Sequence, residues 1–425
     1  MDHSAKRRDF IKFLAASGAL AGCAAVPETP KKPIGRVIVI GGGYGGATAA
    51  KYIRMWSPNI EVFMIDRGTE FVSCPLSNLV LGGSKKIEDL TVSYRGLRDH
   101  GVQVIRDEVT GIDLAKKKVK LTRIEDMPFE RVIVSPGVDF MFDQIPGLNN
   151  ADAQKAILHA WKAGPDTVAL RKQLEDMKDG GVYVLSIPKA PYRCPPGPYE
   201  RACQVASYFK KAKPKSKVLI LDANEDIVSK KGLFLKVWNE QYKGIIEYRN
   251  NAEVKDVDVK GMAAKLDFDT VRGDVLNILP PMKAGKIAES AGLITANNRW
   301  CGVDWLTMES VKAPGVHVLG DATLSAPLMP KSGHMANQHA KVAAAAVTAL
   351  MNGQQPSREP MMVNTCYSFV NDKEVIHVAS VHQYDVAEKT MKVVQGSGGV
   401  SAAPTELEGV YGLAWAQNIW NDMLA

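Results

Sequence analysis

The segment that most constrains the fold is Arg36–Gly46, with the sequence RVIVIGGGYGG. Its apolar half is typical of a buried parallel strand, and Gly41, Gly43 and Gly46 follow at G-x-G-x-x-G spacing where a helix begins. Such glycines permit a tight turn, close approach of the backbone to phosphate, and close packing of helix on strand. The helix N-terminus also offers free N–H groups to an anion. The segment therefore predicts a dinucleotide-binding unit.

An acidic residue at the expected distance supports this interpretation. The predicted strand Glu61–Ile65 ends at Asp66, about twenty residues beyond the last glycine, where a ribose-binding carboxylate is required. The alternative is a glycine-rich turn in an unrelated sheet. That alternative does not explain why strand, helix and acid occur in register.

The first residues are interpreted as an export signal, and we assign residues 1–33 to a signal peptide and linker. Lys6–Lys12 (KRRDFIK) is a twin-arginine pattern, followed by an apolar run too short to span a bilayer. The twin-arginine route carries folded proteins, so we expect a periplasmic location. Leu20–Cys23 (LAGC) also resembles a lipobox, which leaves two alternatives: a lipid anchor on Cys23, or ordinary cleavage just after it.

Composition and charge limit the remaining classes of protein. The chain has 425 residues with 46% hydrophobic and 23% charged content, enough for two or three domains. The signal peptide up to the cleavage site near Cys23 carries four Lys or Arg against two Asp, so without it the net charge falls from +7 to +5. This excess is not clustered, and nucleic-acid binding is not indicated. No other segment is apolar enough to predict a transmembrane helix.

We predict an α/β fold with two dinucleotide-binding-type (Rossmann) domains of the disulfide-reductase kind and a smaller C-terminal α+β domain. The FAD-binding domain is expected to be split between residues 34–147 and 277–355, with the central domain at 148–276 between them. Residues 356–425 form the C-terminal domain, which ends in an aromatic-bearing tail.

Four short apolar runs follow Asp66 within the first part. The runs at 102–105, 109–112 and 119–121 are predicted to make a small β insertion. The run at 131–137 (RVIVSPG) is predicted to return to the parallel sheet and to end in a small-residue turn against the cofactor.

The central domain has the layout of a second nucleotide-binding unit but lacks its glycines. A strand at Gly181–Ile187, a helix at Tyr199–Lys210 and a strand at Lys217–Leu221 predict βαβ. The connecting loop Pro188–Pro198 (PKAPYRCPPGP) is too crowded with proline for backbone to approach a pyrophosphate. We therefore expect no NAD(P) here, and Cys194 occupies the position instead.

A second nucleotide signature follows at Gly320 and Asp321. A short strand at 315–319 ends in this Gly-Asp pair, and the alanine-rich run Ala336–Met351 has strong helix propensity. In flavoproteins of the disulfide-reductase class, this aspartate accepts a hydrogen bond from the ribityl chain. Gly-Asp pairs are common turn signals, so only the combination with Gly41–Gly46 favours FAD.

Cysteine spacing excludes several kinds of centre. No C-x-x-C or C-x-x-C-H occurs, so the chain has no thioredoxin motif and no site for c-type haem. The eight histidines are scattered, and we expect no metal site. Cysteines of an exported protein are free to pair. The six are Cys23, Cys74, Cys194, Cys203, Cys301 and Cys366.

Four long motifs resemble the flavoprotein subunit of flavocytochrome c sulfide dehydrogenase, and the resemblance covers nearly the whole mature chain. They are Phe71–Gly83 (FVSCPLSNLVLGG), His159–Gly181 (HAWKAGPDTVALRKQLEDMKDGG), Ile187–Arg201 (IPKAPYRCPPGPYER) and Pro330–Lys341 (PKSGHMANQHAK).

The resemblance implies roles for particular residues. It implies that the sulfur of Cys74 is joined covalently to the 8α-methyl of FAD. It also implies that Cys194 and Cys366 form a redox-active disulfide beside the isoalloxazine, with the carboxylate of Glu200 nearby. Hydrosulfide would attack that disulfide, and electrons would pass to FAD and then to the haem of a separate c-type cytochrome subunit, giving sulfur or polysulfide.

The residues alone leave other interpretations open. Cys194 is also compatible with a structural disulfide, and Cys74 with a free thiol beside noncovalent FAD. Glu200 is equally compatible with a surface carboxylate on the first turn of a helix. Cys203 and Cys301 are either a structural disulfide or two buried thiols.

Two other functions fit the same sequence. Sulfide:quinone oxidoreduction would require an apolar quinone channel and a membrane-seated C-terminus. A noncatalytic flavin-carrying subunit of a sulfur-oxidising complex would keep the site as an interaction element. Bleaching of the flavin by sulfide, and the identity of the acceptor that reoxidises it, separate the three.

Overall fold

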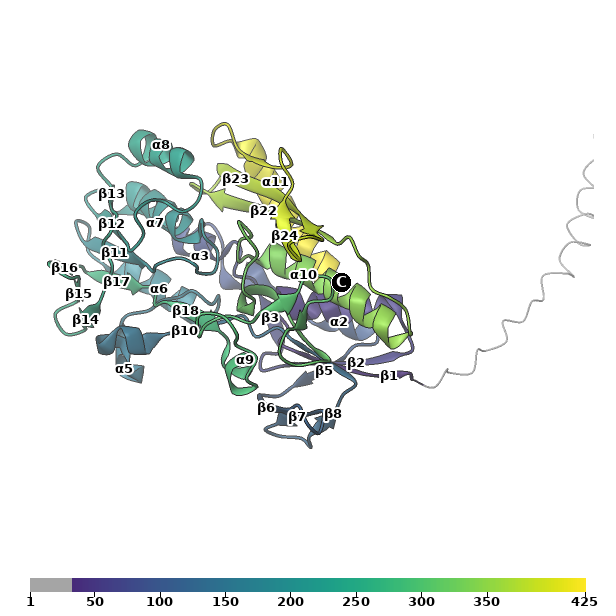
Figure 1. Cartoon of the computed structure of the whole chain (residues 1–425). Helices are drawn as coiled ribbons and strands as arrows, with labels where there is room; N and C mark the ends of the chain where they lie inside the picture. Colours follow the sequence, from purple (N-terminus) through teal and green to yellow (C-terminus); the bar gives the residue numbers. More distant parts are fainter. Residues whose placement is uncertain (1–32) are drawn as a thin grey trace, which may run out of the picture. The chain divides into compact units, whose positions relative to one another are not determined.

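The glycine run lies between a buried strand and a helix, as the sequence predicts. Strand β1 (Gly35–Ile40) leads into helix α2 (Tyr44–Trp56), and β2 (Ile60–Asp66) pairs with β1 in parallel. The last four residues of β1 are buried because parallel sheets are covered on both faces. Figure 1 shows this computed structural model, which describes residues 33–425. The twin-arginine pattern and Cys23 lie outside the described residues.

Strands from distant parts of the chain complete this sheet. Strand β9 (Arg131–Val134) pairs in parallel with β1 on one side and with β21 (Val316–Val318) on the other. The Gly-Asp segment after β21 is therefore brought to the same sheet edge as the glycine loop. The sheet continues from β21 through β20 (Glu309–Ser310) to β19 (Val303–Asp304).

One of the three strands predicted for the β insertion belongs to the main sheet instead, so that part of the prediction is wrong. The run at 102–105 belongs to β5 (Gln103–Arg106), which pairs in parallel with β2 in the main sheet. The insertion consists of β6 (Val109–Asp113), β7 (Lys118–Leu121) and β8 (Met127–Pro128). A parallel neighbour requires a long crossover, and residues 67–102 provide one between β2 and β5.

The central domain has the predicted βαβ layout. Its parallel sheet has the order β13 (Ile246–Arg249), β12 (Lys217–Asp222), β11 (Val182–Ile187) and β17 (Val275–Ile278). Helix α7 (Gly197–Ala212) connects β11 to β12. The proline-rich loop therefore stands at the carboxyl end of β11, where a nucleotide-binding unit has its phosphate loop.

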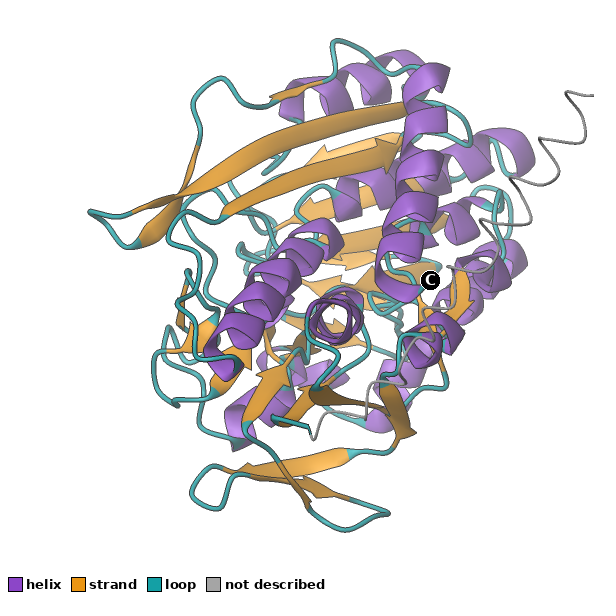
Figure 2. Cartoon of the chain, turned by 90° about the vertical axis from the view of Figure 1, so that its right-hand side faces the viewer, coloured by secondary structure: helices purple, strands orange, loops and turns teal. Residues whose placement is uncertain are grey.

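The C-terminal part packs a sheet and a helix against the first domain. Strands β22 (Met361–Phe369), β23 (Val375–Asp385) and β24 (Thr390–Val393) are antiparallel, and Figure 2 shows them beside the helices. The aromatic-bearing tail is a helix, α11 (Glu406–Leu424), which contacts α2. Among residues 33–425, no helix has the length and apolar character needed to cross a membrane.

Asp422 fastens the C-terminal helix to two others. Its carboxylate accepts hydrogen bonds from Tyr52 on α2 at 2.5 Å and from Asn337 on α10 (Gly333–Met351) at 2.8 Å. Lys341 Nζ on α10 lies 3.0 Å from the same carboxylate. Burial acts to raise the pKa of Asp422, but these hydrogen bonds and the ammonium group outweigh it and hold the pKa below its usual range.

We predict that Asp422→Ala lowers the free energy of unfolding by about 2 kcal/mol, because charge-assisted hydrogen bonds from two helices are lost. The depressed pKa means that Asp422 stabilises the fold at neutral pH and ceases to do so as acid protonates it. The difference from the wild type should therefore shrink at low pH in urea unfolding. As a control, Asp99→Ala removes a loose exposed pair with Arg95 and should cost less than about 0.5 kcal/mol.

Candidate functional site

The glycine loop opens onto a cavity of about 730 Å³, to which the split nucleotide domain, the central domain and the C-terminal sheet all contribute. Of the ten residues predicted for the site, Gly46 lies behind the cavity wall and nine line it. The nine are Gly41, Gly43, Asp66, Cys74, Cys194, Glu200, Gly320, Asp321 and Cys366.

The three glycines of the motif have different local surroundings. Gly41 has a φ of +96°, and a Cβ on Gly46 would lie 1.7 Å from the carbonyl oxygen of Gly41. A Cβ on Gly43, which caps α2, would meet no atom within 4 Å and would project into open space. The helix N-terminus therefore faces a cradle of backbone with no protein side chain in it, which is the geometry that a pyrophosphate requires.

Asp66 is held at the end of β2 by the loops that surround it. One carboxylate oxygen accepts the N–H of Gly42 at 2.7 Å, and the other accepts the N–H of Gly68 at 2.7 Å. Each oxygen retains a free lone pair. Asp66 thus lines the cavity beside the glycine loop. Its carboxylate oxygens can accept hydrogen bonds from ribose hydroxyls.

Asp321 carries an unsatisfied acceptor. Its Oδ1 is buried and has no hydrogen-bond partner. Burial raises the pKa of Asp321, against the opposing charges of Arg193 and Lys331. A buried acceptor without a donor is costly unless a ligand supplies one, and a ribityl hydroxyl is such a donor. Together with the glycine cradle and Asp66, this residue fits FAD.

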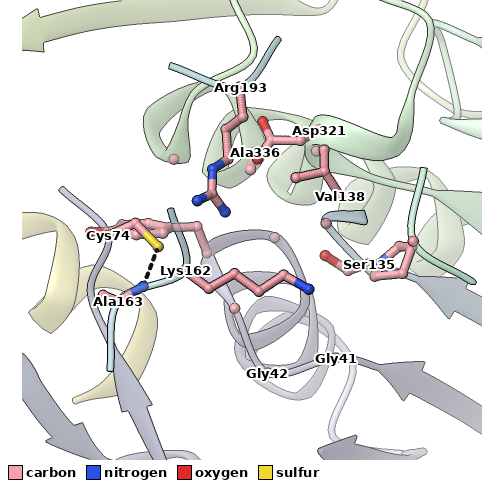
Figure 3. A pocket seen from close by; sticks show the side chains of 18 of the residues that line it. Gly41, Gly42, Cys74, Ser135, Val138, Lys162, Ala163, Arg193, Asp321 and Ala336 are labelled. Atoms are coloured by element: carbon pink, nitrogen blue, oxygen red, sulfur yellow. Dashed lines mark hydrogen bonds between the residues drawn. The ribbon is translucent and has the colours of Figure 1, made fainter. Parts of the chain in front are cut away.

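Cys74 lies in the loop between β3 (Glu70–Val72) and α3 (Ser77–Gly82). Its Sγ accepts the N–H of Ala163 at 3.4 Å (Figure 3). The same figure shows the side chains of Lys162 and Arg193 pointing into the cavity. The sulfur is therefore placed in the cavity wall, where the predicted bond to FAD would require it.

Cys194 and Cys366 reach the cavity from separate elements. Cys194 stands in the proline-rich loop with a φ of +58°, and its N–H donates to the carbonyl of Lys331 at 2.7 Å. Cys366 lies on β22. Both are free thiols in this structure. Burial raises the pKa of Cys194, and the neighbouring charge of Cys366 raises it further, so the two thiols affect each other electrostatically.

Glu200 is buried, so its interpretation as a surface carboxylate is wrong. It lies in the first turn of α7 but is only 7% exposed, because α3 and β22 pack over it. The carboxylate accepts the N–H of Phe369 at 2.9 Å and the amide of Asn78 at 3.0 Å. Burial raises the pKa of Glu200 although these hydrogen bonds oppose the shift.

Two polar residues beside Cys366 are not predicted from the sequence. Lys230 donates to the carbonyl of Cys366 at 2.9 Å, and the Asn364 amide lies 3.3 Å from Cys366 Sγ. Asn364 shares a strand face with Cys366 two residues later, and that spacing is a signal that would have identified it. No sequence signal marks Lys230, because its position depends on the packing of distant strands.

Cys203 and Cys301 are two buried thiols in this structure, which favours free cysteines over a structural disulfide between them. Cys203 accepts the indole N–H of Trp238 at 3.2 Å, whereas the N–H of Cys301 donates to the carbonyl of Ala322. Burial raises the pKa of each thiol to about 12, as expected of inert core cysteines.

Family comparisons cover most of the chain in three segments. Residues 167–280 match the central part of the sulfide dehydrogenase (flavocytochrome c) flavoprotein chain. Residues 358–424 match the flavin-binding part of flavocytochrome c sulphide dehydrogenase. Residues 35–175 match pyridine nucleotide-disulphide oxidoreductase. These segments include Cys74, Cys194, Glu200 and Cys366.

Individual relatives agree with these matches. The chain is 53% identical over 45 residues, 11% of its length, to a sulfide dehydrogenase (flavocytochrome c) flavoprotein chain of Chlorobaculum thiosulfatiphilum, and covers 94% of that sequence. It is 24% identical over 311 residues to the mitochondrial sulfide:quinone oxidoreductase of Mus musculus, covering 68% of this chain but only 65% of the mouse protein. The sulfide:quinone oxidoreductase structure from Aquifex aeolicus has the same fold, with a TM-score of 0.74, 17% identity and 91% of each chain covered.

We predict that Gly43→Ala leaves the fold intact but weakens FAD binding about tenfold or more, equivalent to at least about 1.4 kcal/mol. The added methyl meets no protein atom and occupies the cradle at the N-terminus of α2. Flavin absorbance per chain and the melting temperature of the apoprotein test this. Gly46→Ala is the contrasting variant and should prevent folding, because its Cβ would clash with the Gly41 carbonyl. Full flavin loading of Gly43→Ala would contradict the assignment of the cradle.

Proposed function

This chain belongs to the family of flavocytochrome c sulfide dehydrogenase flavoprotein chains, and on that premise we propose that it is an FAD-dependent sulfide dehydrogenase. The observation that carries the proposal is the meeting of Cys194, Cys366 and Glu200 in the cavity that fits FAD. These residues come from the central domain and the C-terminal sheet, and a purely structural fold has no need to bring them together.

The proposed reaction begins with the oxidised pair. Hydrosulfide attacks Sγ of Cys194, the Cys194–Cys366 bond breaks, and Cys194 becomes a persulfide while Cys366 leaves as a thiolate that carries the negative charge. Cys366 is favoured as the leaving group because Asn364 offers its sulfur a hydrogen bond. Bound FAD supplies a two-electron acceptor that returns electrons one at a time.

Glu200 is proposed to exchange protons with the two thiols. Glu200 lines the same cavity as Cys194 and Cys366. Burial is the main cause that raises the pKa of both thiols, and the charge of Glu200 adds to it. The raised pKa of the buried carboxyl keeps a proton available nearer neutral pH than an exposed glutamate would.

The electron acceptor is proposed to be a c-type cytochrome rather than a nicotinamide. The sequence lacks a C-x-x-C-H motif, so the haem belongs to another polypeptide. In the central domain, Asp222 stands where a ribose-binding acid would be, but it is fully buried. Its carboxylate accepts the hydroxyls of Tyr199 at 2.7 Å and Tyr248 at 3.1 Å. Export to the periplasm by the twin-arginine route is part of the same proposal and rests on Lys6–Lys12.

We predict that anaerobic sulfide bleaches the flavin of the wild type and that Cys194→Ser or Cys366→Ser slows bleaching by about a thousandfold or more, because no disulfide remains to be attacked. Cys203→Ser is the control, since that thiol is buried away from the cavity, and it should bleach at the wild-type rate. The reduced protein should then reduce cytochrome c. Reoxidation by a quinone alone would reject the cytochrome proposal, and no bleaching would favour a noncatalytic subunit.

We predict that the flavin is bound covalently through Cys74, whose sulfur lines the cavity. The mass spectrum of the denatured wild type should show one FAD attached to the peptide that contains Cys74. Cys74→Ser should lose this mass but still bind flavin through the glycine cradle and Asp321. An unmodified Cys74 peptide from the flavin-loaded wild type would show that the cofactor is held noncovalently.

A further inference from the structure

A buried ammonium group lies behind the two cysteines. Lys230, which precedes α8 (Lys231–Gln241), is only 8% exposed. Its three donors are used by the Cys366 carbonyl at 2.9 Å, Ser368 Oγ at 2.7 Å and the Ile376 carbonyl at 3.2 Å. All three acceptors are neutral oxygens on β22 and β23. No directly bonded carboxylate cancels the positive charge, so its field reaches the neighbouring sulfur.

The sulfur of Cys366 also has a direct hydrogen-bond donor. Asn364 Oδ1 accepts the hydroxyl of Ser332 at 2.6 Å, which turns the amide Nδ2 toward Cys366 Sγ at 3.3 Å. Ser332 is itself fixed, because its Oγ accepts the N–H of Met335 and caps α10. The sulfur of Cys366 is thus close to the N–H donor of Asn364. The ammonium group of Lys230 contacts the backbone carbonyl of the same cysteine.

We propose that Lys230 is a positioning residue for the reaction: its charge stabilises the thiolate of Cys366 when the disulfide opens, while the three hydrogen bonds hold β22 in place. This rests on the proposed function, in which the negative charge of hydrosulfide is transferred to Cys366 as the Cys194–Cys366 bond breaks. No further reactant is required, because Lys230 supplies only charge and geometry.

The surrounding charges allow Lys230 to act at neutral pH. Burial lowers the pKa of Lys230 to about 8, against the opposing charges of Cys366, Glu200, Cys194 and Glu408. These are the titratable groups that face it from β22, α7, the proline-rich loop and α11. Burial raises the pKa of Cys366, and Lys230 is the strongest influence in the opposite direction. Ionisation of Cys366 in turn raises the pKa of Lys230, so the ammonium group and the thiolate stabilise each other.

The test measures thiol reactivity in the flavin-loaded full chain, reduced with dithiothreitol and then freed of it. Iodoacetamide labelling of the Cys366 peptide is followed by mass spectrometry across pH, because only the thiolate reacts. Lys230→Met should shift the midpoint upward by at least about one pH unit and slow labelling about tenfold near neutral pH. Lys230→Arg should keep a midpoint close to that of the wild type, since the charge remains.

Two further variants separate charge from packing. Lys231→Met is the matched control, because Lys231 is an adjacent exposed lysine paired with Asp226, and it should leave the midpoint unchanged. Lys230→Gln keeps two N–H donors for the three oxygens but lacks the charge, so it should reproduce the shift even where the methionine variant folds poorly. An unchanged midpoint in a folded Lys230→Gln or Lys230→Met protein would overturn the proposal.

The labelling experiment also distinguishes this proposal from the function on which it rests. It uses no sulfide and no electron acceptor, so the shift can be measured whether or not sulfide bleaches the flavin. A wild type that is not bleached rejects the dehydrogenase. A wild type that is bleached, combined with variants whose labelling midpoint does not move, rejects only the role of Lys230.

Discussion

The contact between Gly46 and the carbonyl of Gly41 is the constraint on which the rest of the site depends. No side chain larger than hydrogen fits there, so α2 approaches β1 closely and its N-terminus points into the cavity. The carboxyl ends of the parallel strands β2, β9 and β21 are then gathered around that N-terminus. Asp66 and Asp321 follow from this arrangement, because each stands just beyond one of those strand ends.

Local sequence predicted the individual strands and helices better than it predicted which strands pair with one another. The β1–α2–β2 unit and the βαβ of the central domain follow from periodicity and from glycine or its absence. The same periodicity does not say which strand a short apolar run pairs with, and the run at 102–105 was therefore assigned to the wrong sheet. Helix α11 was not predicted as a helix. Asp422, Asn337 and Lys341 hold it in place, and this clamp forms only in the folded chain.

In the candidate site, too, residues with a local sequence motif were predicted, and residues whose surroundings depend on tertiary packing were not. Three of the cysteines, most of the glycines and both aspartates that the motifs predicted line one cavity in the structure, because each lies at a fixed position in its own element. The burial of Glu200 was undecided in the sequence, since the first turn of a helix is compatible with either environment. Lys230 had no signal at all. Its surroundings are made by β22 and β23, more than a hundred residues further along the chain.

The location of Cys366 on β22 has a consequence for biosynthesis. The strand that carries this cysteine and the helix that Asp422 fastens to α2 are both translated after the glycine loop and Cys194. A nascent chain still on the ribosome therefore has the glycine loop and Cys194 but lacks one wall of the cavity. Flavin captured at that stage would be exposed on the side of Cys366, so the synthesis and packing of β22 would enclose the cofactor.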